Sequence, residues 1–367
     1  MAYPATAAVV REPGGPFSLE RVELDALREN EVLVRVQACG ICHTDAKFQS
    51  RVPLPGVFGH EGAGVVEETG AAVTSVRAGD QVIISYPWCG ACPSCERSEP
   101  FRCENIPALK FAGRRSDGSR TVRLNGHDVS SAFFQQSSFA THAIALEHAL
   151  VPVQGSWAPE MLAALPCGVQ TGAGAVFNTF RMGPGHSLVM LGVGPVGLSA
   201  IMAARVAGVS PRIAVDINPS RLERALELGA THALDASRDD VPRRVREWLP
   251  RGVSHALESS ITVSALKDAM KCLGQGGKVG IFSAPPPGEE FAFSTRDLFE
   301  RVGSLHGIVQ GSAVPREFLP RLMELQRAGR FPYERLISTY DFADINSAFA
   351  DLEEGTAIKP VLVFPED

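Results

Sequence analysis

The sequence predicts an α/β protein with two domains, one rich in β-strands and one built on a doubly wound parallel sheet. A chain of 367 residues is long for a single hydrophobic core, so two domains are expected. Residues 7–85 hold short alternating or apolar runs separated by Gly, Pro and Asp, which is typical of strands joined by turns. From about Met161, strand-like and helix-like segments alternate, which indicates a parallel sheet.

The first domain is expected to contain strands in three runs, which are EVLVRVQACG, GAGVVEETG and DQVIISY. The stretch after Cys103, FAGRRSDGSRTVRLNGHD, is polar and rich in Gly, so we expect a loop there. A lone strand is expected to follow in FATHAIAL.

The second domain is expected to alternate strands with helices. The predicted order is a strand in SLVML, a helix through Ala207, a strand in RIAVD, a helix through Leu228 and a strand in KVGIF. The tail from about Gly303 returns to mixed elements and ends in KPVLVF, which we expect to be a strand that rejoins the first domain. We find no internal repeat and no low-complexity segment.

Composition and charge favour a protein that acts on small neutral molecules. The net charge is −6, and no basic stripe is visible, which excludes nucleic acid and anionic membranes as the expected partners. The opening MAYPATAAVV lacks the basic segment of a secretory signal, so a reducing cytoplasm is the expected location. The long apolar stretch Leu188–Val209 carries several glycines, Pro195 and Arg205, which favours a buried strand, turn and helix over a membrane span.

Four of the eight cysteines lie in one short segment, CGACPSCERSEPFRC. The spacing C-x-x-C-x-x-C-x7-C supplies four thiolates that can close a tetrahedron around zinc and leave no position open for water or substrate. We therefore predict a structural zinc site, although four unrelated buried cysteines are the alternative. Its ligands are Cys89, Cys92, Cys95 and Cys103.

A second, dispersed set of residues suits a catalytic zinc. Cys42 in CGICHTD, His60 in GHEGAG and Cys167 in LPCGVQTG provide three ligands and leave one position open. An alcohol on such a site can lose its proton near neutral pH and remain able to release hydride. We expect Asp45 to contact the far nitrogen of His60 and Glu61 to lie beside the metal.

A glycine-rich turn lies in SLVMLGVGPVGLSAIMAARVAGVSPRIAVD. The glycines of the G-x-G-x-x-G pattern, Gly192, Gly194 and Gly197, follow an apolar strand and open a helix, and Asp216 ends the next strand. Such a turn lets the backbone approach a pyrophosphate, while the carboxylate binds an adenosine ribose and repels a 2′-phosphate. The pattern predicts a dinucleotide site that prefers NAD to NADP.

These three sets, in this order, resemble the zinc-dependent medium-chain alcohol dehydrogenases over essentially the whole chain. The segments FQQSSFATHA, DINPSRLERALELGATHALD and AIKPVLVF also look like that family, and the first is most similar to its aryl-alcohol (benzyl-alcohol) branch. The resemblance implies a GroES-like catalytic domain in residues 1–168, rejoined by residues 308–367, and a Rossmann NAD-binding domain in residues 169–307. It also implies two zinc ions per chain and a homodimer or homotetramer.

The resemblance also implies roles for individual residues. Cys42, His60 and Cys167 match the catalytic zinc ligands, and Thr44 matches the hydroxyl residue that passes the alcohol's proton to the cofactor ribose. The remaining cofactor positions are His43 and Lys359 near the pyrophosphate, Thr171 and Val196 beside the nicotinamide, Gly192, Gly194, Pro195 and Gly197 in the turn, and Asp216 and Arg221 at the adenosine. For His43, Lys359 and Arg221, solvated surface charge is the alternative.

One position departs from the family pattern. A histidine often ends the proton relay three residues after the Thr44 position, and here Lys47 takes that place. A protonated lysine is a poor base at neutral pH. Lys47 is therefore not expected to take the proton unless burial or a nearby cation lowers its pKa. We interpret Cys39 and Cys272 as small buried hydrophobic residues.

The expected activity is oxidation of a primary alcohol by NAD, with aromatic or allylic alcohols as the leading substrates. Tyr86, Phe133 and Phe134 are expected to line an apolar substrate pocket, although buried aromatics are often plain core. A terpenoid alcohol or a thiol-dependent formaldehyde adduct is the alternative substrate. Two minor alternatives come from other functional classes. One is a dinucleotide-binding protein with a structural zinc and no catalytic activity, and the other is a nucleic-acid-binding protein.

Overall fold

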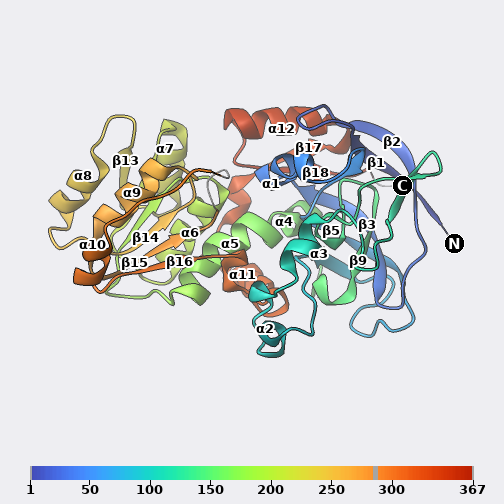
Figure 1. Cartoon of the computed structure of the whole chain (residues 1–367), viewed down its shortest axis with the longest axis horizontal. Helices are drawn as coiled ribbons and strands as arrows, with labels where there is room; N and C mark the ends of the chain where they lie inside the picture. Colours follow the sequence, from blue (N-terminus) through green and yellow to red (C-terminus); the bar gives the residue numbers. More distant parts are fainter. Residues whose placement is uncertain (1, 284–287, 366–367) are drawn as a thin grey trace. The chain divides into compact units, whose positions relative to one another are not determined.

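The chain divides into two compact units, and the computed structural model describes residues 2–283 and 288–365 (Figure 1). Unit 1 comprises Met1–Cys167, Val314–Met323 and Glu334–Asp367. Unit 2 comprises Gly168–Ala313 and Glu324–Tyr333.

The first sheet of unit 1 has the strand order β4-β1-β2-β7-β8. Its strands are β1 (Tyr3–Val10), β2 (Ser18–Leu24), β4 (Gly56–Val57), β7 (Val122–Leu124) and β8 (His127–Asp128). Our prediction of a loop after Cys103 was wrong here, because β7 and β8 form a hairpin that pairs with β2. The hairpin turns at Asn125 and Gly126, which both have positive φ as a tight two-residue turn requires.

The second sheet of unit 1 has the order β10-β6-β5-β3-β18-β17, with β9 also paired to β3. Its strands are β3 (Glu31–Gly40), β5 (Gly62–Thr69), β6 (Gln81–Ile84), β9 (His142–Leu146), β10 (Leu150–Pro152), β17 (Ile337–Asp341) and β18 (Lys359–Val363). Strand β18 runs antiparallel to β3, with Leu362 opposite Cys39. The structure thus confirms that KPVLVF returns to the β-rich part of the chain.

Short helices connect these strands and carry much of the candidate site. The helices of unit 1 are α1 (His43–Lys47), α2 (Pro93–Glu96), α3 (Ile106–Phe111), α4 (Pro159–Ala163), α12 (Ile345–Glu354) and most of α11 (Pro315–Arg327). Phe349 and Leu352 of α12 pack with Leu362 of β18 in the main core of the unit. The C-terminal segment is therefore anchored by both backbone pairing and apolar burial.

Unit 2 is built on a six-stranded parallel sheet with the order β13-β12-β11-β14-β15-β16. The strands are β11 (Leu188–Leu191), β12 (Arg212–Asp216), β13 (His232–Asp235), β14 (Val253–Glu258), β15 (Leu273–Ile281) and β16 (Ser304–Gly307). The strand order reverses between β11 and β14, as in a doubly wound nucleotide-binding sheet. The predicted fold class is confirmed.

The described part of unit 2 also contains helices, some of which contact strands of the sheet (Figure 1). They are α5 (Gln170–Gly174), α6 (Pro195–Val206), α7 (Pro219–Leu228), α8 (Val241–Trp248), α9 (Val263–Cys272) and α10 (Thr295–Glu300). Val189, Ile213 and Leu266 lie in the core between strands and helices. Within the described ranges, no helix is both long and apolar enough to cross a bilayer.

Candidate metal centres and dinucleotide turn

The four cysteines of the segment after β6 come together in unit 1. The sulfur atoms of Cys89, Cys92, Cys95 and Cys103 all lie within 4.8 Å of one another. Cys92 and Cys95 are separated by a single turn because α2 begins at Pro93, and their sulfur atoms are 3.5 Å apart. None of the four forms a disulfide. This geometry suits a tetrahedral metal site closed on all sides by protein.

The dispersed set also converges. The side-chain ligand atoms of Cys42, His60, Glu61 and Cys167 all lie within 4.8 Å of one another. Cys42 precedes α1, His60 and Glu61 precede β5, and Cys167 lies in a π-helical turn that follows α4. Wide helical turns of this kind often occur at functional sites, because they displace one side chain from the regular helical face.

Asp45 fixes the orientation of His60. Its Oδ1 lies 2.8 Å from Nδ1 of His60, and its carboxylate also accepts the N–H groups of Cys42 (3.0 Å) and Gly59 (3.2 Å). Gly59 has a φ of +91° and a Cβ there would lie 2.4 Å from the nitrogen of Phe139, so only glycine fits. With Nδ1 occupied, Nε2 of His60 is left to face the two cysteines.

The imidazole of His60 is buried with its second nitrogen unpaired. Nε2 of His60 is buried and has no hydrogen-bond partner among the described residues. Burial lowers the pKa of His60, but the adjacent Asp45 carboxylate more than offsets this, and the net result is a pKa of about 10. A site that stabilises a proton on this ring also stabilises a metal cation, which competes with the proton for Nε2.

Glu61 forms a buried ion pair that the sequence did not reveal. Its Oε1 lies 2.5 Å from Nζ of Lys359, which also donates to the carbonyl of Ile41 at 3.2 Å. Both side chains are almost fully buried, so solvated surface charge does not describe Lys359. Burial raises the pKa of Glu61 to about 7. Oε2 of Glu61 is unpaired and is available to a cation in this site.

The predicted relay residues lie on α1. Thr44 is half-buried, and its hydroxyl lies 3.5 Å from the sulfur of Cys42. His43 and Lys47 are exposed on the same helix. Lys47 is therefore not desolvated by the described part of the chain.

Aromatic rings lie against the dispersed metal set. Phe134 stacks on His60 with ring centroids 4.4 Å apart, and Phe133 meets the same imidazole edge-on at 5.8 Å. Tyr86, like both phenylalanines, is buried. Phe134 has a φ of 51°, a strained value for an aromatic residue and one that is common at functional sites.

Sequence reasoning missed a buried lysine beside these rings. Lys110 on α3 is only 3% exposed, and its Nζ lies 4.9 Å from the Tyr86 ring centroid and 5.0 Å from that of Phe134. The surrounding run, IPALKF, contains no chemical motif that could have singled it out.

In unit 2, the glycine-rich turn has the predicted geometry. Gly192 has a φ of +82°, and a Cβ on Gly197 would lie 2.1 Å from the carbonyl oxygen of Gly192. Gly194 precedes α6 and has open space where a side chain would be. The N-terminus of α6 lacks a side-chain cap, so its N–H groups are available to an anion.

The other predicted cofactor residues of unit 2 surround this turn. Asp216 accepts the N–H of Val193 at 2.7 Å, which ties the end of β12 to the turn. Thr171 is buried on α5, which packs closely on α6: a Cβ on Gly172 would lie 1.9 Å from the carbonyl oxygen of Val196. Arg221 is partly buried at the start of α7, with its Nε unpaired among the described residues.

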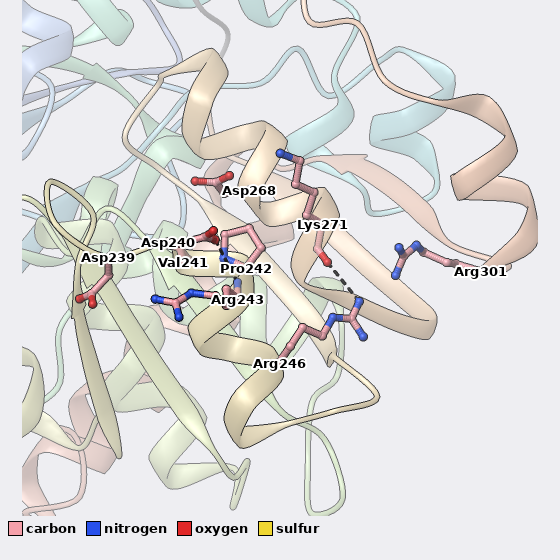
Figure 2. A pocket seen from close by; sticks show the side chains of 9 residues that line it. All are labelled: Asp239, Asp240, Val241, Pro242, Arg243, Arg246, Asp268, Lys271 and Arg301. Carbon is pink, nitrogen blue, oxygen red and sulfur yellow. Dashed lines mark hydrogen bonds between the residues drawn. The ribbon is translucent and has the colours of Figure 1, made fainter.

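An open hollow of about 660 Å³ in unit 2 contains none of the predicted site residues (Figure 2). Its charged groups are engaged locally: Arg246 donates to the carbonyls of Lys271 (3.1 Å) and Leu273 (2.7 Å), and Asp240 caps α8. We therefore assign no function to it. Its lining residues are Asp239, Asp240, Val241, Pro242, Arg243, Arg246, Asp268, Lys271 and Arg301.

Two family models match the chain. The model of the alcohol dehydrogenase GroES-like domain matches residues 28–155, and that of the zinc-binding dehydrogenases matches residues 195–326. Geraniol dehydrogenase of Castellaniella defragrans is 41% identical over 364 residues, which cover 98% of each chain. The chain belongs to the zinc-dependent medium-chain alcohol dehydrogenases and is an oxidoreductase of that family.

Solved structures agree with this assignment. A zinc-binding alcohol dehydrogenase domain protein from Burkholderia ambifaria is 44% identical, covers 100% of both chains and has a TM-score of 0.97. Benzyl alcohol dehydrogenase from Acinetobacter calcoaceticus is 39% identical, with a TM-score of 0.95 over 99% of this chain and 100% of its own. The predicted family is confirmed, and membership implies zinc and NAD(H) as cofactors.

Proposed function

We propose that the protein oxidises a primary aromatic or allylic alcohol to its aldehyde with NAD as the hydride acceptor. The observation that supports this most strongly is the convergence of Cys42, His60 and Cys167, with the buried Nε2 of His60 unpaired among the described residues. A protein that only bound a dinucleotide would have no need of this second set of ligands beside the four-cysteine cluster.

We assign a catalytic zinc to Cys42, His60 and Cys167, with Glu61 as an adjacent carboxylate. The two sulfurs, the unpaired Nε2 of His60 and the unpaired Oε2 of Glu61 match the donors that zinc prefers. When bound, zinc would act as a Lewis acid that makes the alcohol hydroxyl acidic. A second zinc would hold the segment Cys89–Cys103 together and take no part in the reaction.

In this proposal, the chain's own residues position the alcohol and carry away its proton. Thr44 lies beside Cys42, where its hydroxyl would accept the proton of the alcohol and release its own towards a bound cofactor's ribose. Because Lys47 is exposed, we infer that water or buffer takes the proton from there. His43, which is exposed, remains a proposed contact of the pyrophosphate. Lys359 does not suit the same role, because it is buried and its ammonium is engaged by Glu61 and the carbonyl of Ile41.

The proposed cofactor site of unit 2 suits NAD. The turn at Gly192, Gly194 and Gly197 accommodates a pyrophosphate at the N-terminus of α6. Asp216 would bind the adenosine ribose and repel a 2′-phosphate. We propose that Val196 and Thr171 border the nicotinamide, that Pro195 contacts the cofactor from the turn, and that Arg221 lies against the adenosine.

The apolar wall of Tyr86, Phe133 and Phe134 supports an aromatic or allylic substrate. Similarity to benzyl alcohol and geraniol dehydrogenases favours the same two classes. A terpenoid alcohol such as geraniol is therefore the first alternative, and a thiol adduct of formaldehyde is the second.

We further infer a homodimer or homotetramer in the cytoplasm. Strand β16 is the edge of the parallel sheet, and the exposed residues Phe299 (84%), Val302 (74%) and Val309 (47%) lie close to it in sequence. An exposed sheet edge with apolar side chains favours pairing with another chain. Analytical ultracentrifugation of the protein and of Phe299→Lys would test this, since a monomer in both cases contradicts it.

A panel of alcohols tests the proposed activity. Benzyl, cinnamyl and geranyl alcohols, ethanol and S-hydroxymethylglutathione would be offered with NAD, and formation of reduced cofactor measured. We expect benzyl or cinnamyl alcohol to give a far higher kcat/KM than ethanol, because a ring removes more apolar surface from water on binding. Ethanol performing as well as benzyl alcohol would contradict the substrate class, and no turnover of any alcohol would contradict the activity.

A further inference from the structure

Lys110 is a buried cation for which the described residues supply no hydrogen-bond acceptor. It is 3% exposed, and among the residues that the structure describes none accepts a hydrogen bond from its ammonium or pairs with it. Its contacts are the faces of Tyr86 and Phe134. An ammonium has three donors, and ring faces offset only part of the cost of burying them. The ammonium is thus left with donors that a ligand could satisfy.

The position of Lys110 is fixed by its surroundings. The amide of Gln135 donates to the carbonyls of Leu109 (3.0 Å) and Arg114 (3.1 Å), which ties the end of α3 to the turn at Phe133–Gln135. Phe111, the next residue on α3, meets the Phe134 ring edge-on at 5.5 Å. The ammonium is therefore held in place by packing and does not depend on a flexible surface side chain.

Phe134 links this ammonium to the proposed catalytic centre. One ring contacts both the His60 imidazole, at 4.4 Å between centroids, and the Lys110 ammonium, at 5.0 Å from its centroid. The ammonium thus lies no further from the imidazole than these two distances together. Both groups therefore lie within reach of one small aromatic alcohol.

We propose that Lys110 is a specificity-determining residue that donates a hydrogen bond to an oxygen on the ring of the substrate, at the end remote from the hydroxymethyl group. This inference rests on the proposed function and narrows its substrate class to aromatic alcohols that carry an alkoxy, carbonyl or carboxylate substituent. Burial lowers the pKa of Lys110 to about 8, so the residue remains mostly protonated, and a donor, at neutral pH.

Pairs of substrates with equal shape test the proposal. 4-Methoxybenzyl alcohol is compared with 4-ethylbenzyl alcohol, and 4-(hydroxymethyl)benzoate with 4-isopropylbenzyl alcohol, together with their 3-substituted isomers. In the wild-type protein, the oxygen-bearing member of at least one pair should have a kcat/KM about tenfold higher or more, as expected for a charge-assisted hydrogen bond. No preference in any pair would overturn the proposal.

Substitution of Lys110 supplies the second arm of the test. Lys110→Met should reduce the preference to about one or below while still oxidising the alkyl-substituted alcohol, whereas Lys267→Met, at an exposed lysine of unit 2, should leave the preference unchanged. Since each preference is a ratio within one preparation, partial loss of folded protein does not alter it. An unchanged ratio in Lys110→Met would also overturn the proposal. If that variant does not fold, Lys110→Leu, which also lacks a donor, replaces it.

Failure of the proposed alcohol oxidation can be distinguished from failure of the proposed role of Lys110. If plain benzyl alcohol is not oxidised, the activity itself is wrong, and the same pairs are then compared by calorimetric binding to the wild type and Lys110→Met. A binding preference that disappears in the variant would still support the role of Lys110. Equal binding of both members by both proteins would reject it.

Discussion

At the residue scale, Asp45 determines how His60 is presented to a metal. The carboxylate holds Nδ1 of His60 at 2.8 Å and also accepts two backbone N–H groups. Such supporting carboxylates fix both the ring orientation and the tautomer of a ligating histidine. The proposed catalytic site therefore depends on a residue that is not itself a proposed metal ligand.

We predict that Asp45→Asn weakens binding of the catalytic zinc by about 10–100-fold, because the amide lacks the charge that supports the imidazole. Competition with a chelator, followed by the loss of one zinc per chain, measures the effect. The four-cysteine site should retain its zinc and serves as the internal control. Equal zinc affinity in Asp45→Asn and the wild type would show that Asp45 has no such role.

Residue chemistry was predictable where the sequence itself carried the constraint. The four clustered cysteines lie in one short segment, so their spacing alone indicated a closed metal site. Asp45 was inferable because it lies close in sequence to Cys42. The Glu61–Lys359 pair joins residues that are distant in sequence, and they meet because β3 pairs with β18 on one side and with β5, which Glu61 precedes, on the other. Lys110 was missed because its burial depends on packing of α3 against the turn at Phe133–Gln135.

At the element scale, we expect loss of a ligand from the four-cysteine cluster to affect stability and loss of a ligand from the dispersed set to affect activity. The segment Cys89–Cys103 has a small core of its own that includes Leu109 and Trp88. Too few apolar groups lie there to order the segment without a metal. Cys167, in contrast, lies in the helical segment Leu165–Val169, whose other residues are buried.

We predict that Cys95→Ser lowers the thermal stability of the protein and that Cys167→Ser abolishes alcohol oxidation with only a modest loss of stability. Differential scanning calorimetry, metal analysis and the rate of NAD reduction would be measured for both variants. The wild type should contain two zinc ions per chain and each variant one. A wild-type content of a single zinc would contradict the two-site interpretation.

We propose that Asp216, beside the turn after β11, determines the choice of cofactor. Asp216 ends β12 and accepts the Val193 N–H of that turn at 2.7 Å. We predict a preference for NAD over NADP on the order of a hundredfold in kcat/KM, since a 2′-phosphate would meet this carboxylate. Asp216→Gly should narrow the preference. Similar kcat/KM values with both cofactors in the wild type would refute the prediction.

Elements were predictable where strand and helix patterns were strong. Strand β12 coincides with the predicted strand RIAVD, and α7 ends at Leu228 as predicted. The β7–β8 hairpin was missed because its strands are short and Gly-rich polar sequence surrounds them. The Asn125–Gly126 dipeptide was the available signal, because both residues accept the positive φ of a tight hairpin turn.

At the scale of the whole molecule, each unit contains a histidine held neutral by burial. Burial and then Arg316 lower the pKa of His148 in unit 1 to about 4, and burial and then His186 lower that of His255 in unit 2 to about 4. The unfolded chain binds protons on these rings near pH 6.5, whereas the folded chain does so only near pH 4. Their contribution to stability is therefore present above pH 6.5 and is lost as the pH falls towards 4.

We predict that stability falls between about pH 6.5 and pH 4, with a slope of about 1.4 kcal/mol per pH unit for each of the two histidines. His148→Gln and His255→Gln should each flatten the fall relative to the wild type. Melting temperatures across this range measure it, and the difference between variant and wild type cancels the acid release of zinc, which affects all of them. Parallel pH profiles would contradict the prediction.

The fold class followed from the sequence because the alternation of strands and helices and the glycine-rich turn are local patterns. The strand order of unit 2, with its reversal between β11 and β14, then matched the expected doubly wound sheet. The substrate is harder to predict, since it depends on the shape left between side chains from α3, β6 and the turn at Phe133–Gln135. No spacing of residues encodes that shape.

The central claim is that hydride passes from an aromatic alcohol to NAD in a zinc-dependent reaction. It is tested most directly with benzyl alcohol deuterated at the carbinol carbon, by mass analysis of the cofactor after turnover. We predict one deuterium in the reduced nicotinamide for each benzaldehyde formed, and no reaction in Cys167→Ser. Benzaldehyde formed without deuterium in the cofactor, or formed equally well by Cys167→Ser, would contradict the account.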